Sequence, residues 1–362
     1  MVVIMKDNIK PINIALQGGG AHGAFTWGVL DALLEDGRID IDGISATSAG
    51  AMNASVYAYG MMCGGNDGAR QALHDFWQDV SQISKTASFT KAIAPFTNNP
   101  IFAMFGGASE LLAQMNFNML NNFTEMFSPY QFNPMNINPL KDVLLKHVDF
   151  DSLKTCELVR LFICATNVKN NKIKIFSNHK DNDDITVDAI MASACLPMLF
   201  QAVEIKGEFY WDGGYVGNPA LYPLFYQTKT DDMMVVHINP IERNDLPTKP
   251  HEIANRINEL SFNSSLLREF RAIAFVQKMI DEGWIKDEFL PQITHSQFFM
   301  HAIRADDVMR KYDVANKFSV DWGFLCNLRD AGIATTKEWL KHNFVNIGVK
   351  STLDIRKEYL SD

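Results

Sequence analysis

The first sixty residues alternate between short apolar runs and helical patterns, and this alternation limits the possible folds more than any other feature of the chain. Residues 12–16 predict a buried strand, and apolar residues recur at helical spacing from Phe25 to Leu34. A second strand is predicted from Ile41 to Ala46, followed by a helix that begins near Ser48. Because β-α-β-α units form right-handed parallel crossovers, we expect an α/β fold: a central, mostly parallel sheet with helices on both faces.

A glycine-rich turn joins the first predicted strand to the first helix. It consists of Gly18, Gly19, Gly20, Ala21, His22 and Gly23. Such a turn exposes backbone N–H groups, which can hold either an oxyanion or the phosphates of a dinucleotide. A dinucleotide fold also needs a carboxylate at the end of the second strand. That strand ends in Ala46, Thr47 and Ser48, whereas Asp40 and Asp42 lie at its beginning, so the oxyanion interpretation is favoured.

The second strand-to-helix turn, Ala46-Thr47-Ser48-Ala49-Gly50, places a serine among small residues. A nucleophile elbow needs small residues on both sides because the strained turn packs tightly. Serine is also a favoured helix N-cap, which is the structural alternative for Ser48. With the glycine loop before it, the turn predicts that Ser48 is the nucleophile of an acyl hydrolase.

A serine hydroxyl needs a base to attack an ester at neutral pH. None of the nine histidines lies in a glycine-bracketed turn; His22 is within the glycine loop and His237 is in an apolar strand. The sequence instead offers Asp212, which ends a short β-like run and is followed by Gly213 and Gly214. Asp-Gly is also a common hairpin turn, so this motif is weak when taken alone.

These three motifs together resemble the patatin-like phospholipases. That family carries a Gly-Gly-Gly-x-x-Gly oxyanion loop, a G-x-S-x-G elbow and an Asp-Gly-Gly or Asp-Gly-Ala motif, matched here in order by residues 18–23, 46–50 and 212–214. The resemblance spans about residues 12–240 and implies the patatin-like three-layer fold. It also implies that Asp212 takes the proton of Ser48 while loop N–H groups hold the oxyanion, without calcium.

The chain departs from the family pattern at two positions. Ala46 replaces the usual glycine, and His22 stands where many members carry arginine or lysine, which bears on the electrostatic assistance that the loop gives to the oxyanion. An aspartate of ordinary pKa is a poor base at pH 7. We therefore expect apolar neighbours such as Tyr210 and Trp211 to raise the pKa of Asp212, or the geometry of attack to compensate.

We expect residues 1–245 to form the catalytic α/β core and residues 246–362 to form a helical C-terminal region packed on it. Within the core, the segment at about 92–140 is rich in methionine and phenylalanine and has no charged residues except Glu110 and Glu125. It is either a lid or funnel for acyl chains or a helical insertion packed on the core. Asp188 is placed to cap a helix that runs through Ser193.

The composition limits the kinds of molecule that the protein is expected to bind. The chain has 33 basic and 42 acidic residues, a balance that disfavours nucleic acid. Its five cysteines follow no metal or disulfide spacing, and we expect no metal or other cofactor. No run approaches the roughly 18 apolar residues of a membrane span, and no signal peptide is evident. These features predict a cytoplasmic or peripheral membrane protein, with export by a non-classical route left open.

The sequence is consistent with three hypotheses about the function. The favoured one is a serine–aspartate lipid acyl hydrolase acting on phospholipid or lysophospholipid esters at a membrane or micelle surface. A second is a latent member of the same family that becomes active only with a membrane or a protein partner, whose identity is unknown. A third is a nucleotide-binding protein that uses the glycine loop, which the missing strand-end carboxylate weakens.

Overall fold

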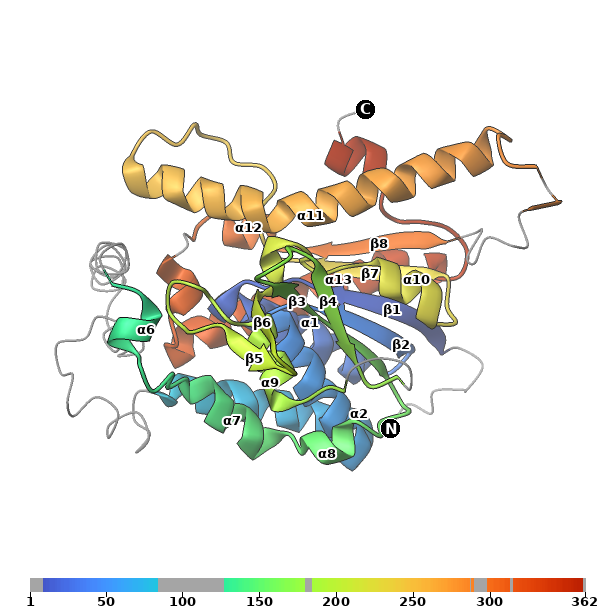
Figure 1. The fold of residues 1–362 in the computed structure, drawn as a ribbon. Coiled ribbons are helices and arrows are strands. Elements are labelled where there is room, and N and C mark those ends of the chain that lie inside the picture. Colours follow the sequence, from blue (N-terminus) through green and yellow to red (C-terminus); the bar gives the residue numbers. More distant parts are fainter. Residues whose placement is uncertain are drawn as a thin grey trace.

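The computed structural model describes residues 9–83, 127–179, 184–286, 288–289, 298–312 and 315–360. One mixed sheet runs through the middle of the molecule (Figure 1). Its strands lie in the spatial order β5 (Val203–Ile205), β6 (Glu208–Asp212), β3 (Arg160–Asn167), β2 (Ile39–Ala46), β1 (Lys10–Leu16), β7 (Asp232–His237) and β8 (Phe299–Arg304), with β4 (Ile173–Ser177) paired to β3. The strands from β3 to β8 in this order pair in parallel, whereas β4, β5 and β6 pair antiparallel. The predicted α/β fold with a mostly parallel sheet is confirmed.

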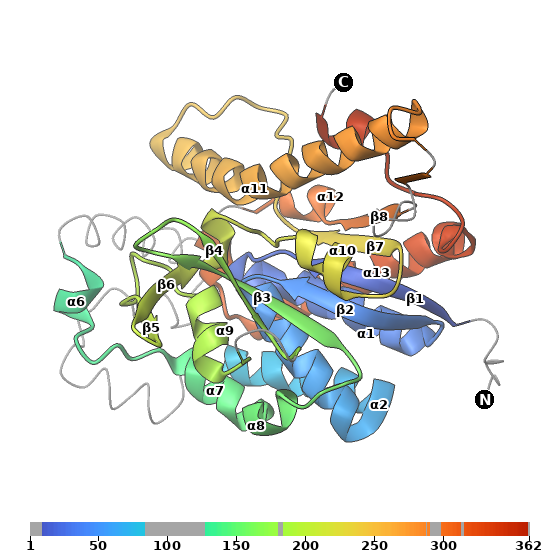
Figure 2. The same ribbon diagram turned by 45° about the vertical axis from the view of Figure 1, so that its right-hand side comes forward.

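Helices cover both faces of the sheet, which gives three layers (Figures 1 and 2). Side chains alternate between faces along a strand, so Ile14 and Leu16 of β1 pack in one core and Ala15 packs in the other. The first core packs under α1 (Gly23–Asp36), α2 (Ala49–Ser81) and α13 (Trp322–Asn343). The second core packs under α10 (Tyr222–Gln227) and α11 (Pro250–Asp281).

Shorter helical elements complete the description. They are η2 (Gly20–His22), α6 (Pro129–Phe132), α7 (Pro139–His147), α8 (Phe150–Leu153), α9 (Val187–Ser193), η4 (Gly213–Tyr215), α12 (Asp306–Met309), η6 (Ala315–Phe318), η7 (Phe344–Asn346) and η8 (Arg356–Leu360). Two of them, η2 and η6, pack against each other although nearly three hundred residues separate them in the chain.

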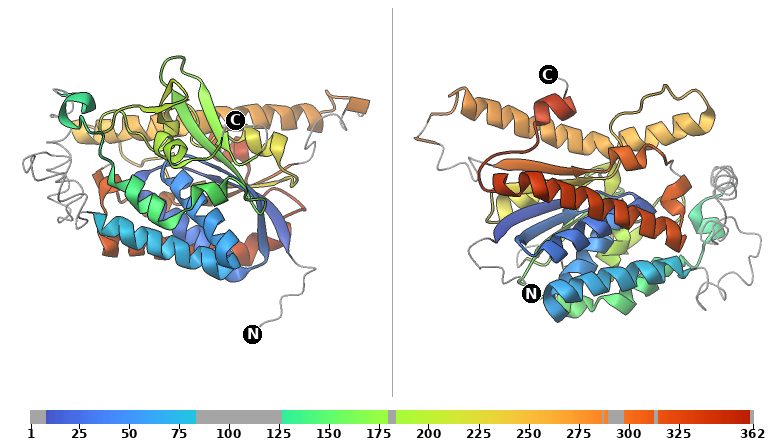
Figure 3. Two further views of the ribbon diagram at one scale, coloured as in Figure 1. Left: turned by 60° about the horizontal axis from the view of Figure 1, so that its bottom comes forward. Right: turned by 180° about the vertical axis from the view of Figure 1, so that it is seen from behind.

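The C-terminal region, predicted to be helical, also supplies a strand. β8 pairs in parallel with β7, with Phe299 beside Asp232 and Arg304 beside His237. From behind, α13 lies across the molecule between α11 and α2 (Figure 3, right), and it packs along α1. The prediction of helical cover therefore missed an edge strand of the central sheet.

Two local predictions can be compared with the structure. Thr186 caps α9, with its hydroxyl oxygen accepting from the Ala189 N–H at 3.1 Å, so the prediction of Asp188 as the cap is wrong. Asp188 lies in the first turn and pairs with Lys141 at 2.7 Å. α2 extends to Ser81 through a kink at residues 64–65. Most of the segment rich in methionine and phenylalanine, residues 92–126, lies outside the described residues.

Candidate active site

The turn after β2 holds Ser48 in a strained backbone conformation. Ser48 has φ 55° and ψ −122°, which residues other than glycine avoid because Cβ crowds the backbone. Its N–H donates to Ser193 Oγ at 2.9 Å, and Gly50 lies so close to β1 that a Cβ there would be 2.5 Å from the Leu16 carbonyl oxygen. Within this described turn, the Ser48 side chain makes no capping hydrogen bond. The geometry favours a nucleophile elbow over an ordinary N-cap.

The small residues beside Ser48 lie where an elbow needs them. Ala46 is the buried last residue of β2, and Ala49 lines the cavity next to Ser48. Thr47 is buried, and its hydroxyl donates to the Gly217 carbonyl oxygen at 2.7 Å. The turn is therefore tied to both the sheet and the loop that follows the Asp-Gly-Gly motif.

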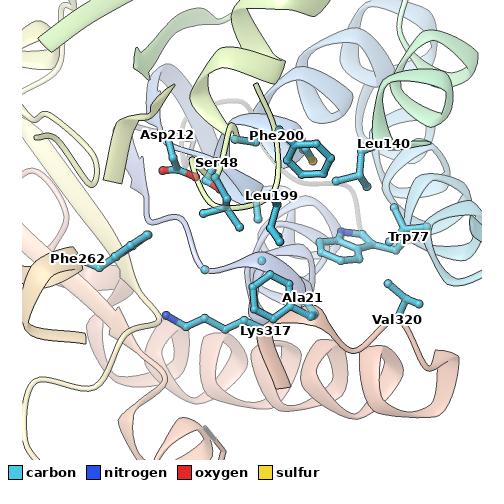
Figure 4. A pocket seen from close by; sticks show the side chains of 18 of the residues that line it. Ala21, Ser48, Trp77, Leu140, Leu199, Phe200, Asp212, Phe262, Lys317 and Val320 are labelled. Carbon is cyan, nitrogen blue, oxygen red and sulfur yellow. The ribbon is translucent and has the colours of Figure 1, made fainter. Parts of the chain in front are cut away.

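Strand β3 brings Asp212 to Ser48. Ile163 of β3 pairs with Ala46 of β2, and two residues later Ala165 pairs with Asp212 of β6. β4 occupies the opposite edge of β3 over these residues. β6 therefore continues the line of β2, and Asp212 lies just beyond the carboxyl end of β2, where Ser48 follows. Figure 4 shows the two side chains pointing toward each other.

The Asp212 carboxyl is fully buried, and its two oxygens have different surroundings. Oδ1 accepts a hydrogen bond of 2.7 Å from the Gly214 N–H, within the turn that Gly213 begins. Oδ2 has no hydrogen-bond partner of normal geometry in the described part of the chain. Burial raises the pKa of Asp212 to about 6, against the lowering effects of the Gly214 N–H, the nearby Ser48 hydroxyl and Lys317. Burial thus acts in the direction expected from the sequence.

Three N–H groups of the glycine loop already bind other protein groups. Gly18 donates to Asn218 Oδ1 at 2.7 Å, His22 donates to the Gly19 carbonyl oxygen at 3.2 Å, and Gly23 donates within η2. Gly18, His22 and Gly23 are also absent from the described lining of the cavity beside Ser48. The sequence grouped all six loop residues together, whereas the structure separates these three from the others.

The other loop residues, Gly19, Gly20 and Ala21, line the cavity with Ser48 and Asp212. The N–H groups of Gly19 and Gly20 donate to no group among the residues that the structure describes. Gly20 has φ 59°, and a Cβ at this position would be 2.3 Å from the carbonyl oxygen of Lys317. Only glycine accommodates both the backbone conformation and this close approach.

The cavity has an empty volume of about 970 Å³, including its open mouth. Its wall is mostly apolar and comes from α2, α7, the loop after α9 and the segment before α13 (Figure 4). The apolar lining includes Met52, Phe76, Trp77, Val80, Leu140, Leu196, Leu199, Phe200, Phe318 and Val320. A polar part is formed by Asn258 and Lys317, with Phe262 beside them.

Comparison with known proteins identifies the family. A model of the patatin-like phospholipases matches residues 14–225. The chain belongs to the patatin-like phospholipase family. The match covers more than half of the chain and includes the glycine loop, the serine turn and the Asp-Gly-Gly motif, so the resemblance stated from the sequence is confirmed. Membership of this family supports a lipid hydrolase.

Two solved structures are similar to this chain over most of its length. VipD from Legionella pneumophila is 15% identical, with 89% of this chain and 67% of VipD covered and a TM-score of 0.37. The type III effector protein ExoU is 13% identical, with 94% of this chain and 54% of ExoU covered and a TM-score of 0.35. This chain thus spans about two thirds of VipD and about half of ExoU. A search of curated proteins finds no significant match.

His22, the residue at which the glycine loop departs from the expected pattern, is buried among aromatic rings. Its ring is buried near the rings of Tyr312 and Phe324, with centroids 6.1 Å and 6.4 Å away. Burial, followed by the charges of Lys317 and Arg243, lowers the pKa of His22 to about 3. His22 is therefore neutral at pH 7 and does not supply the positive charge that many family members carry in this loop.

Lys317 places a positive charge near the site, and sequence reasoning missed it. Its Nζ donates to Asn239 Oδ1 and Asn258 Oδ1, each at 2.9 Å. Burial lowers the pKa of Lys317 to about 8, whereas Glu259 and Asp212 act to raise it. No local signal marks this lysine, because it reaches the cavity only through the packing of η6 on the glycine loop.

The rival sites considered from the sequence are not assembled here. Asp40 and Asp42 lie at the amino end of β2, away from the cavity, and the Asp42 carboxylate accepts from the Lys229 N–H there. No histidine is among the described residues that line the cavity. Over the described ranges, no three potential metal ligands from His, Cys, Asp and Glu come together.

Among the helices in those ranges, none has the length and apolar character needed to span a bilayer.

Proposed function

We propose that this protein hydrolyses carboxylic esters of phospholipids or lysophospholipids with Ser48 as nucleophile and Asp212 as base. The observation that carries this proposal is the meeting of a strained serine and a buried carboxyl oxygen, beside two loop N–H groups. Among the described residues, neither that oxygen nor these N–H groups have a hydrogen-bond partner. The apolar cavity around them suits an acyl chain. We propose that the enzyme acts at the surface of a membrane or micelle. We also keep the proposed division into a catalytic region, residues 1–245, and a C-terminal region, residues 246–362.

The first half-reaction forms an acyl-enzyme. Ser48 Oγ attacks the ester carbonyl carbon while Asp212 Oδ2 takes the hydroxyl proton. The carbonyl oxygen becomes an oxyanion, for which Gly19 and Gly20 offer free N–H groups. When the tetrahedral intermediate collapses, the bond to the alcohol breaks and Asp212 returns the proton to the leaving oxygen.

The second half-reaction uses the same groups in the opposite sense. Asp212 takes a proton from water as the water oxygen attacks the acyl carbon, and the Ser48 oxygen leaves and receives that proton. The fatty acid is then released. The raised pKa of Asp212 suits this alternation, because a carboxyl with a pKa of about 6 is a stronger base than an ordinary aspartate and is still mostly ionised at pH 7.

The assignment of Ser48 can be tested with an active-site probe. A fluorophosphonate should label the wild-type protein on Ser48, as found by peptide mapping, and Ser48→Ala should abolish both labelling and ester hydrolysis. Ser55→Ala is the matched control, because Ser55 is a buried serine of α2 that donates to the Ala51 carbonyl oxygen within the helix. Labelling of another serine in the Ser48→Ala protein would refute the assignment.

The latent alternative is separated by its dependence on an activator. Hydrolysis by the purified protein with lipid alone supports the direct enzyme, whereas hydrolysis that requires added cell lysate supports a latent one. Probe labelling of Ser48 without lysate, combined with lipid hydrolysis only in its presence, would indicate a formed site whose access is controlled.

A further inference from the structure

The cavity has two chemically different sides, with Ser48 between them. Figure 4 shows Trp77 and Leu140 on one side and the charged end of Lys317, near Phe262, on the other. The apolar side suits an acyl chain, as proposed above. The polar side then faces the alcohol part of the ester, because the two parts leave the carbonyl carbon in different directions.

Lys317 is half-buried, and its charge has no ion-pair partner in the described part of the chain. Its ammonium group has three N–H donors, and two of them go to the amide oxygens of Asn239 and Asn258. The nearby carboxylate of Glu259 is already paired with Arg243 and Arg256. Desolvating a charge that no carboxylate pairs with is costly. The nearby Phe262 ring, whose centroid lies 5.0 Å from Nζ, carries no net charge, so the third donor and the charge stay available to an anion.

Asn258 adds a neutral donor at the same place. Its Oδ1 accepts from Lys317, which turns the amide nitrogen of Asn258 away from that bond. The amide N–H groups have no acceptor among the described residues, and Asn258 lines the cavity beside Lys317. Both side chains line the cavity, so a lysine donor and an amide donor are available there to phosphate oxygens.

In a phospholipid, a phosphate is bound to the glycerol that carries the acyl esters. We propose that Lys317 and Asn258 bind this phosphate, so that the enzyme prefers phospholipid esters over neutral glycerides with the same acyl chains. This inference rests on the proposed hydrolase function. It also gives Lys317 a role different from that of a cation in the glycine loop, which would assist the oxyanion of every ester equally.

The test compares two substrates that differ only in the phosphate-bearing headgroup. Short-chain phosphatidylcholine and diacylglycerol with identical acyl chains are assayed with wild type, Lys317→Met, Lys317→Arg and the exposed control Lys311→Met. We expect Lys317→Met to lower kcat/KM for phosphatidylcholine by about 10- to 100-fold, mainly through KM, as loss of a charged hydrogen bond does. Diacylglycerol hydrolysis should fall severalfold less, because it loses only the effect of the Lys317 charge on the pKa of Asp212. Lys317→Arg should keep most of the preference for phosphatidylcholine.

Equal losses for both substrates would overturn the proposal and place Lys317 on the oxyanion or in the fold. An unchanged preference would overturn it as well. Circular dichroism of each variant separates a folding defect from these outcomes, and a misfolded Lys317→Met protein is replaced by Lys317→Gln.

A binding measurement separates failure of this inference from failure of the hydrolase function. Calorimetric titration of the Ser48→Ala protein with the two lipids needs no turnover. The phosphate site is supported if Ser48→Ala binds phosphatidylcholine more tightly than diacylglycerol and the Ser48→Ala/Lys317→Met double variant does not. This holds even if wild type hydrolyses neither lipid. Equal affinity for both lipids refutes the site even if wild type hydrolyses both.

Discussion

Replacing Asp212 by asparagine should inactivate the enzyme and stabilise its fold. Asparagine has nearly the same shape, and its oxygen can still accept from the Gly214 N–H. It cannot take a proton from Ser48, so activity should fall by at least the roughly 10²- to 10⁴-fold that general-base catalysis provides. The change also removes a buried carboxylate whose ionised form burial disfavours.

The size of the stabilisation follows from the pKa of Asp212. Burial raises this pKa from 3.8 in the unfolded chain to about 6 in the folded protein. At 1.36 kcal/mol for each pKa unit, ionised Asp212 lowers the free energy of unfolding by about 3 kcal/mol. Between pH 4 and pH 6 the folded state binds more protons than the unfolded state, so wild type loses this stability as the pH rises. The advantage of Asp212→Asn should therefore be near zero below pH 4 and reach about 3 kcal/mol above pH 6.

The measurement is urea unfolding of both proteins at pH 4, 5 and 7, beside single-turnover hydrolysis of an ester. Asp306→Asn is a control in which the free energy of unfolding should change in the opposite direction. Pairing with Arg304 contributes to the lowered pKa of Asp306, so this variant should lose stability at pH 7. An Asp212→Asn advantage that does not grow with pH would show that the Asp212 pKa is not raised. A stable variant with wild-type activity would remove Asp212 from the mechanism.

Three further predictions follow from the same geometry. Ser48→Gly should be about 1 to 3 kcal/mol more stable in urea than Ser48→Ala, because glycine tolerates φ 55° without strain. Gly20→Ala should abolish activity by pushing the loop away from Lys317, whereas Gly64→Ala, where a Cβ meets nothing within 4 Å, should leave hydrolysis unchanged. For phospholipid, kcat/KM should rise with pH through about 6 as Asp212 ionises and fall through about 8 as Lys317 loses its charge. A neutral glyceride should show only the rising limb, and a falling limb for both substrates would contradict the assignment of Lys317.

The parts of the site that could be predicted from the sequence are those fixed by local chemistry. Ser48 stands out because a serine in a turn of small residues, after one buried strand, has few structural explanations. Asp212 stands out because it ends a strand and is followed by two glycines. Their meeting depends on the register of β3 with β2 and β6, which single-sequence patterns do not give.

The missed features depend on contacts between distant segments. Lys317 reaches the glycine loop because η6 packs on η2, and nothing in the neighbouring sequence distinguishes this lysine from a surface one. The sequence did not predict β8 because its apolar pattern is short and is interrupted by His301. This histidine is buried and forms a hydrogen bond of 2.9 Å with Asp232. The choice of Asp188 over Thr186 as a helix cap failed because both residue types cap helices well.

Two energetic costs of the described structure coincide at the cavity, the strained backbone of Ser48 and the buried carboxyl of Asp212. Ser48 is one of four residues other than glycine with positive φ, and the others are Asn136, Asn171 and Lys206, which are not among the residues described as lining the cavity. Asp212 Oδ2 is one of five buried side-chain atoms that lack a hydrogen bond in the described ranges. A fold selected for stability alone would pair or replace these groups. Their retention at the end of β2 and β6 is explained if each is needed for attack on an ester, so substitutions that relieve the strain at Ser48 or the buried charge of Asp212 should stabilise the fold as they remove activity.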